Sequence, residues 1–368
     1  MATPRLRDRD AIVTEEGLVF RVFGYSHPPD AYVCDAEYAP ATIFKSDNPK
    51  AFRNQGQHVF YKFYEDEGWK FVEKSYPQYM IPHEMLQKKI IGVNQSDISK
   101  VRKPEKELTK LIQTEPKDSL LAAMRNVLDI AVDQSGLPIE SFGVFGSMLH
   151  GFYHAGFSDI DLIVYGKENV ATLRKTLQEL YEAKSSILRN EFEMEESISG
   201  KVWRFRNFTP KEFLWHQRRK LVYSLFDSKE SGRTIKTEFE PVKDWKEICS
   251  EYNSAKRILQ RGWVRMLARI RDDSDAPFIP SVYHIEPLKI LEGERQAQQV
   301  KRIISYMEEF RMQAFRDETI YVEGNLEEVT GEKDGFFQIA LTYCPRYYEQ
   351  VLKKAGIRKT PLLACARK

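Results

Sequence analysis

A glycine-serine pair followed at a fixed spacing by two aspartates constrains this chain more than any other feature. The apolar segment 142–145 ends in Gly146-Ser147, eleven residues follow, and a second apolar segment opens with Asp159-Ile160-Asp161. Residues i and i+2 of a β-strand project from the same face, so the two carboxylates are expected side by side. The pattern predicts a strand, a turn, a short helix and a second strand that begins at the paired acids.

The chemistry of these residues suits a metal-bound phosphate. Two adjacent carboxylates are hard ligands for Mg²⁺, which keeps several waters and takes further ligands from substrate phosphates. Gly146 allows close approach of the backbone to a phosphate, and the Ser147 hydroxyl and the following helix N-terminus can donate hydrogen bonds to it. The parts needed for metal-dependent phosphoryl or nucleotidyl transfer therefore lie within sixteen residues.

The same segment resembles the signature of the DNA polymerase β-like nucleotidyltransferase superfamily. The resemblance is strict over about residues 141–166 and weaker out to about residue 243. The family's Gly-Ser, second glycine and Ser-Asp-x-Asp correspond here to Gly146, Ser147, Gly151, Ser158, Asp159 and Asp161. A departure is His150, where many members carry arginine.

The resemblance implies an NTP substrate and two divalent ions, Mg²⁺ or Mn²⁺. It implies that Asp159 and Asp161 are catalytic and bind the metal ions, and that the nucleotide is bound by Gly146, Ser147, His150 and Ser158. Family members usually add a third carboxylate from a neighbouring strand, which completes a two-metal site.

The third carboxylate has two candidates. In the segment 233–242, alternation predicts a strand with Ile235, Thr237 and Phe239 on one face and Lys236, Glu238 and Glu240 on the other. The segment is similar to a strand of class I CCA-adding enzymes that ends with an acid, two further residues and a proline. Counting back from Pro241, the resemblance selects Glu238 as a catalytic and metal-binding residue. The family usually has aspartate there. Asp227 is the rival, and an exposed strand acid is the alternative for both.

Composition limits the protein class. The 368 residues are 42% hydrophobic and 30% charged, ordinary values for a soluble globular protein, and the length suits two or three domains. The net charge of +2 neither favours nor excludes a polyanionic partner, so a nucleic-acid surface must be local.

The cysteines and the apolar runs indicate a cytoplasmic protein without membrane contact. The four cysteines, at positions 34, 249, 344 and 365, have no metal-ligand spacing and suit reduced thiols. No apolar run approaches the roughly 20 residues of a membrane span, and residues 1–10 lack the apolar core of a secretory signal.

Periodicity and turn signals predict an α/β (α+β) fold in which a mixed sheet with helices is flanked by β-rich regions. The expected divisions are a β-rich region 1–97, a nucleotidyltransferase domain 98–245, a basic amphipathic helical segment 246–279 and a small β-rich domain 280–368.

Local signals predict individual elements. Segments 58–64 and 69–73 are expected to form a hairpin, Asp118 and Asn169 are expected to cap helices, and residues 300–316 fit either a helix or strands.

Two basic segments suggest a nucleic-acid acceptor. Arginines recur at every fourth residue within 253–271, which on a helix would form a cationic ridge for nucleic acid: Arg257, Arg261, Arg265 and Arg269. Basic and aromatic residues also mix within 203–220. They suit phosphate gripping and base stacking, or a half-buried aromatic face covered by cationic side chains.

The sequence thus predicts a metal-dependent enzyme that transfers a nucleoside monophosphate from an NTP, such as ATP, to an acceptor hydroxyl on an RNA end or another nucleic acid. A protein acceptor, as for minimal nucleotidyltransferases, is an alternative, and an antibiotic-like small molecule is a third. A further alternative, from a different functional class, is a nucleic-acid-binding protein with the same fold and no catalytic activity.

Overall fold

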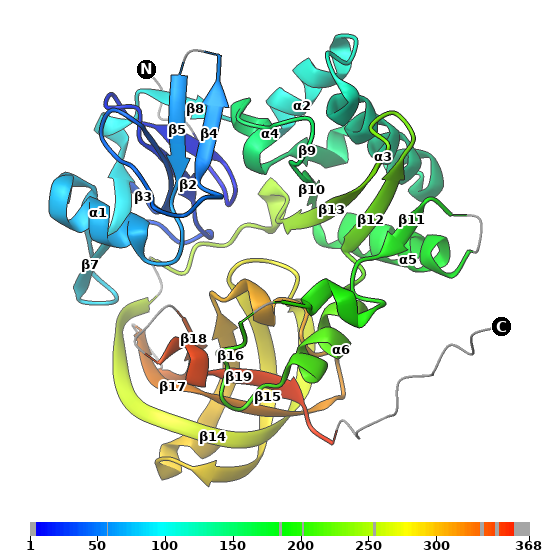
Figure 1. The fold of residues 1–368 in the computed structure, drawn as a ribbon. Coiled ribbons are helices and arrows are strands. Elements are labelled where there is room, and N and C mark those ends of the chain that lie inside the picture. The colour runs from blue at the N-terminus through cyan, green and yellow to red at the C-terminus, as the bar shows by residue number, and fades with distance from the viewer. Residues whose placement is uncertain are drawn as a thin grey trace.

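The computed structural model describes residues 5–56, 58–183, 186–200, 202–252, 255–331, 335–342 and 346–356. Within them the chain forms three sheets of eight, five and six strands. Figure 1 shows the first sheet in blue, the central sheet in green, and the third sheet from yellow to red. Among the helices of these residues, none is long and apolar enough to cross a membrane.

The first sheet contains β1 (Ala11–Val13), β2 (Val19–Val22), β3 (Ala31–Pro40), β4 (Phe52–Gln55), β5 (His58–Lys62), β6 (Met80–His83), β7 (Lys88–Asn94) and β8 (Lys100–Arg102). The central sheet contains β9 (Phe142–Val144), β10 (Ile160–Tyr165), β11 (Leu188–Asn190), β12 (Tyr223–Ser228) and β13 (Arg233–Val242). The third sheet contains β14 (Ala255–Asp275), β15 (Ser281–Glu292), β16 (Val300–Ser305), β17 (Thr319–Gly331), β18 (Phe336–Leu341) and β19 (Val351–Lys354). The helices are α1 (Glu67–Ser75), α2 (Pro104–Gln113), α3 (Ser119–Ser135), α4 (Gly146–His150), α5 (Lys167–Glu182) and α6 (Pro210–Lys220).

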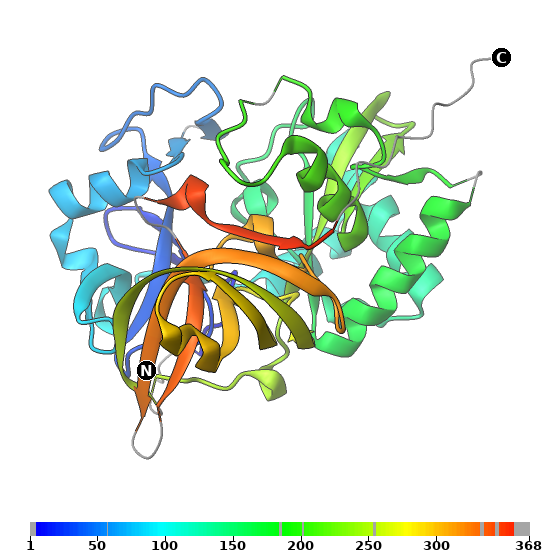
Figure 2. The same ribbon diagram turned by 90° about the horizontal axis from the view of Figure 1, so that it is seen from below.

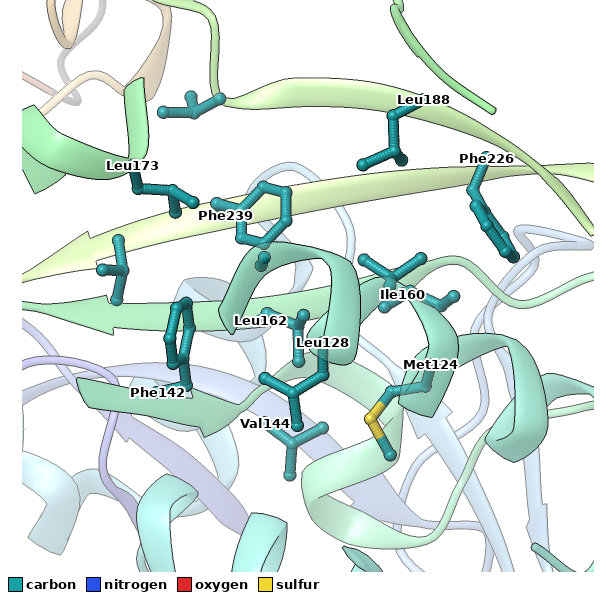
Figure 3. Packing of buried hydrophobic residues seen from close by; sticks show 14 of the residues in the cluster. Met124, Leu128, Phe142, Val144, Ile160, Leu162, Leu173, Leu188, Phe226 and Phe239 are labelled. Carbon is teal, nitrogen blue, oxygen red and sulfur yellow. The ribbon is translucent and has the colours of Figure 1, made fainter. Parts of the chain in front are cut away.

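The central sheet is mixed, with the strand order β11-β12-β13-β10-β9. Strands β10 and β13 are parallel, and the other neighbours are antiparallel. Apolar side chains of one face pack on α3 and α5, as Figure 3 shows for Leu128, Leu162 and Phe239. This arrangement confirms the predicted mixed sheet with helices packed against it.

Helix α3 begins where the sequence predicted. The carboxylate of Asp118 accepts hydrogen bonds from the backbone N–H groups of Leu120 and Leu121, both at 3.0 Å, which satisfies donors left open at a helix start. Gly136 ends the helix in the left-handed conformation. Helix α5 differs, because Gly166 is its cap and Asn169 lies inside it, so the predicted Asn169 cap is wrong.

The opposite face of the central sheet is covered by the first sheet. Ile163 and Tyr165 alternate with the helix-facing residues of β10 and join Tyr38, Phe145 and Phe152 in one buried cluster. The strand alternation thus turns one set of β10 side chains toward helices and the other toward the first sheet and α4. Asp161 belongs to the second set.

The predicted helix over 253–271, and with it the helical segment 246–279, is wrong, since the residues from Ala255 to Asp275 form the long strand β14. A repeat of four residues lies on one face of a strand as well as of a helix. The buried apolar residues decide, because they alternate with period two: Val264, Met266, Ala268 and Ile270. Figure 2 shows β14, in yellow-green, as a long curved strand of the third sheet.

Two other regions resolve ambiguous patterns. Residues 69–73 lie in helix α1, so the hairpin predicted with residues 58–64 is wrong. Residues 300–305 form β16, followed by a short 3₁₀ turn at Glu308–Phe310.

The aromatic residues within 203–220 are half-buried or buried against the third sheet. Trp203, Phe205, Phe208 and Phe213 pack on its core, and α6 is tied to β19 by the Lys353–Glu212 ion pair of 2.8 Å. The half-buried aromatic face is therefore the correct reading of this segment.

A buried ion network joins the three sheets. Arg9, from the turn before β1, donates to Glu240 of β13 at 2.9 Å. Arg311, from the segment between β16 and β17, donates to the same carboxylate. Both arginines are completely buried. Buried charges are stable only when paired, so this network fixes the three sheets relative to one another.

We expect Arg311→Met to lower the free energy of unfolding by about 3–5 kcal/mol, because it leaves Glu240 with one buried partner fewer. Chemical denaturation followed by circular dichroism measures the change. Arg189→Met is the matched control, since its ion pair with Asp227 is half exposed, and such pairs contribute less than about 1 kcal/mol. Equal effects of the two substitutions would contradict the role of the network.

Candidate active site

Strand register brings three carboxylates toward one another. Asp159 lies directly before β10, and Asp161 is the second residue of that strand. Asp161 is paired with Glu238 on the parallel neighbour β13. Adjacent strands lie about 4.8 Å apart and paired residues share a face, so Glu238 projects alongside Asp161.

The rival Asp227 lies elsewhere. Tyr223 of β12 is opposite Glu238, and Asp227 is four residues farther along, opposite Thr234. Four strand residues span about 13 Å. The Asp227 carboxylate also accepts hydrogen bonds from Arg189 at 2.9 Å and from the Thr234 hydroxyl at 2.6 Å. Glu238 is therefore the acid that the register brings beside the aspartates.

Gly146 lies against the Asp161 carboxylate. Its φ is +60°, and a Cβ added there would be 2.1 Å from Oδ2 of Asp161. Only glycine fits this left-handed conformation and this contact at low cost. Helix α4 begins at Gly146, so the predicted order of strand, turn, helix and strand is confirmed.

Two residues predicted to bind the nucleotide serve the fold in this structure. His150 is 1% exposed; its ring lies 3.4 Å from the Glu37 carboxylate and packs on Tyr38 and Phe152. A side chain so enclosed cannot reach a nucleotide, so the His150 prediction is wrong. The Ser158 hydroxyl accepts a hydrogen bond from the His154 N–H at 2.8 Å, which shapes the loop before Asp159.

The site carries uncompensated negative charge. Burial, followed by the Asp159 charge, raises the pKa of Asp161 from 3.8 to about 7, and the Lys62 ammonium partly opposes this shift. Withdrawal from water also raises the pKa of Asp159. Carboxylates forced together in this way hold protons or bind cations.

Glu238 and Glu240 occupy neighbouring positions on one face of β13 but differ in their surroundings. Burial opposes ionisation of Glu240, yet Arg311 and Arg9 hold its pKa below the ordinary value. Burial and the charge of Glu240 raise the pKa of Glu238, although Arg311 donates to its Oε1 at 2.8 Å. Glu240 is thus a structural anion, whereas Glu238, 28% exposed in its side chain, faces the aspartates.

The residues present suit a divalent cation whose coordination shell is completed by phosphate oxygens of the substrate. Carboxylate oxygens are the ligands that Mg²⁺ and Mn²⁺ prefer, and burial together with the Asp159 charge raises the pKa of Asp161. In the described part of the chain, no three potential ligands converge into a preformed metal cage. Mg²⁺ commonly uses one or two carboxylates and takes other ligands from phosphates and water, which fits Asp159 and Asp161.

The arginine row on β14 does not form a helical ridge. Arg261 pairs with Glu328, at 2.5 Å, and Arg265 pairs with Glu323 and Glu292, both at 2.7 Å. These glutamates come from the neighbouring strands β17 and β15. Two members of the row, Arg261 and Arg265, are thus paired with acids of their own sheet, whereas Arg257 and Arg269 are exposed. Nucleic-acid binding by Arg257, Arg261, Arg265 and Arg269 stays a prediction.

Sequence reasoning did not identify the charged residues that the other two sheets supply, namely Arg9, Lys62 and Arg311. Arg311 reaches Glu238 from 73 positions away in the chain. No local pattern marks such long-range contacts.

The part of the chain that carries these residues is similar in sequence to known proteins. Residues 124–226 match the family model described as a nucleotidyltransferase domain. The chain is also 26% identical over 337 residues to the uncharacterized protein MJ1086 of Methanocaldococcus jannaschii, and the similar region covers 88% of this chain and 92% of that protein. No solved structure matches the chain. The match to the domain model confirms the resemblance that the Gly-Ser and Asp-x-Asp signature predicted.

We expect Gly146→Ala to weaken Mn²⁺ binding about tenfold or more, because the added methyl group displaces the Asp161 carboxylate. Isothermal titration measures the affinity. Gly136→Ala is the control: its φ of +68° gives similar backbone strain, roughly 1–2 kcal/mol, and nothing lies within 4 Å of the added carbon. Equal metal affinity in the two variants would contradict the proposed contact.

The stability of the metal-free protein should depend on the Asp161 charge. The pKa of Asp161 in the folded protein is raised to about 7, so the protonated carboxyl group is favoured by folding. Its contribution to the free energy of unfolding is complete below pH 4 and is lost as the pH rises through 7. In EDTA, Asp161→Asn should therefore be more stable than wild type at pH 8, on the order of 4 kcal/mol, and equal near pH 4.

Denaturation at both pH values measures this difference. Asp227→Asn is a control of opposite sign, since hydrogen bonds from Arg189 and Thr234 lower the pKa of Asp227. It should destabilise the protein slightly at pH 8. A loss of stability at pH 8 in Asp161→Asn would refute the electrostatic interpretation.

Proposed function

Because residues 124–226 are a nucleotidyltransferase domain, we propose that this enzyme transfers a nucleoside monophosphate from an NTP to an acceptor hydroxyl with two divalent ions. The observation that carries the proposal is the pairing of Asp161 with Glu238 on parallel strands, with Asp159 two residues before Asp161, directly ahead of β10. Asp159 and Asp161 could hold the ions together with the phosphates, and Glu238 lies on the neighbouring strand, where a third acid would complete a two-metal site.

In this reaction the acceptor oxygen forms a bond to the α-phosphorus, the bond from that phosphorus to the bridging oxygen breaks, and pyrophosphate leaves. Bound Mg²⁺ or Mn²⁺ would offset the charge that develops on the phosphoryl oxygens. Asp159 and Asp161 would hold the ions, and the Gly146 backbone and the Ser147 hydroxyl would contact the phosphates.

Glu238 is suited to take the proton of the attacking hydroxyl. Its raised pKa, which burial and Glu240 cause, makes it a better base at neutral pH than an ordinary carboxylate. Arg311 donates to Oε1 and so limits the orientations of the carboxyl group. Orientation matters because misplacement by about 1 Å costs roughly a hundredfold in rate.

We propose a nucleic-acid acceptor, an RNA end in particular. The supporting observation is an exposed aromatic pair in the loop before Asp159: the rings of His154 and Phe157 stack at 3.9 Å, and Phe157 is 67% exposed. Exposed aromatic rings bind single-stranded bases by stacking. The arginine row on β14 adds little support for a nucleic-acid acceptor, because Arg261 and Arg265 are paired with acids of the same sheet.

Purified protein is incubated with each α-labelled NTP, Mg²⁺ or Mn²⁺, and total RNA. We expect label transfer that EDTA abolishes and that Asp159→Asn, Asp161→Asn and Glu238→Gln each lower by about a thousandfold or more, since the charges that hold the metal are lost. Asp227→Asn should retain activity within about threefold, because Asp227 lies apart from the site.

The destination of the label distinguishes the acceptors. Label on the protein itself would favour a protein acceptor over RNA. An absence of transfer, together with metal-independent, salt-sensitive RNA binding that survives Asp159→Asn, would instead favour a silent nucleic-acid-binding protein.

A further inference from the structure

Strand β5 of the first sheet packs against the segment that follows Gly146-Ser147. The Phe60 ring stacks on Phe152 with centroids 4.5 Å apart. Tyr38 of β3 meets Phe152 edge-on at 5.1 Å and the His150 ring at 5.2 Å. This side of the first sheet therefore borders the Gly-Ser turn of the candidate site.

Lys62 lies on the same side. It is opposite Tyr38 in the antiparallel pair of β3 and β5 and two residues after Phe60. Directly opposed residues, and residues i and i+2, share a face of a sheet. Lys62 is also the last residue of β5, so its flexible side chain is at the strand end and is half-buried.

The Lys62 ammonium lies 5.9 Å from the centroid of the Tyr64 ring, on the same side of the sheet as Tyr38 and Phe60, and near the candidate acids. Its charge favours the ionised forms of Asp159 and Asp161. In the part of the chain that the structure describes, no ion pair within 4.0 Å joins it to a carboxylate. Nearby cations differ: Lys236 pairs with Glu191, and Arg311 pairs with Glu238 and Glu240.

We propose that Lys62 binds the polyphosphate of the NTP at the site of Asp159 and Asp161; this inference rests on the proposed function. A lysine ammonium is a compact charge with three donors and binds phosphate readily. A metal-bound polyphosphate retains negative charge and would attract the nearby unpaired cation. The first sheet thus becomes part of the nucleotide site, and β5 supplies a contact that the nucleotidyltransferase domain lacks.

The first test is steady-state kinetics with Lys62→Ala and Lys62→Gln. The KM for the NTP should rise about tenfold or more, because a charge-assisted hydrogen bond is lost, while kcat stays within about threefold. Lys62→Arg, which keeps the charge, should recover most of the affinity. Lys70→Ala is the matched control, since Lys70 is an exposed lysine of α1 that pairs with Asp66.

The second test needs no turnover. Calorimetry with inorganic pyrophosphate and Mg²⁺ should show binding to wild type and Lys70→Ala and about tenfold weaker binding to both neutral Lys62 variants. If wild type transfers no nucleotide but this difference remains, the proposed function fails while the Lys62 contact stands. Unchanged pyrophosphate affinity in folded Lys62→Gln would overturn the contact. Tighter Mg²⁺ binding by Lys62→Gln with an unchanged KM for the NTP would also overturn it, because Lys62 would then only neutralise the aspartates.

Discussion

The paired arginines on Glu240 are the interaction on which the rest of the structure depends. Arg9 comes from the start of the chain, Glu240 from the central sheet, and Arg311 from the third region, and both arginines are completely buried. Since an unpaired buried charge is strongly unfavourable, the three parts cannot separate without exposing or orphaning these groups. The same Arg311 donates to Glu238, so the contact that joins the sheets also orients a carboxylate of the candidate site.

One face of the central sheet therefore carries acids in three different states. Glu240 is held as an anion by two guanidinium groups. Asp161 is buried and lies beside Asp159, and burial followed by the Asp159 charge raises its pKa to about 7. Glu238 lies between these extremes, in contact with Arg311 but desolvated and next to Glu240. Strand alternation alone puts these side chains on one face; the neighbouring sheets determine which of these acids are neutralised by arginine.

The first and third sheets lie mostly outside the residues that match the nucleotidyltransferase domain model, but they belong to the region that is similar to another protein. The domain model covers residues 124–226, yet similarity to the archaeal protein extends over 337 residues. The first sheet covers the lower part of β10 through the cluster of Tyr38, Phe152 and Ile163, and the third sheet contacts the segment around α6. The first sheet thus packs against the side of β10 that carries Asp161, and the third sheet reaches the central sheet through Arg311 and its partners Glu238 and Glu240.

The sequence by itself determined the local parts of the site. The Gly-Ser turn, the Asp-x-Asp strand, the Asp118 cap and the alternation of β13 follow from short-range periods and backbone preferences, which act over a few residues. It could not determine β14, because arginines at every fourth residue share one face in a helix and in a strand alike. The resemblance favoured Glu238 over Asp227, but the strand register was needed to show which acid lies beside Asp161. The sequence also could not exclude His150 or identify Lys62 and Arg311. Those outcomes depend on strand register and on packing between residues far apart in the chain, and only the tertiary structure decides which charges become neighbours.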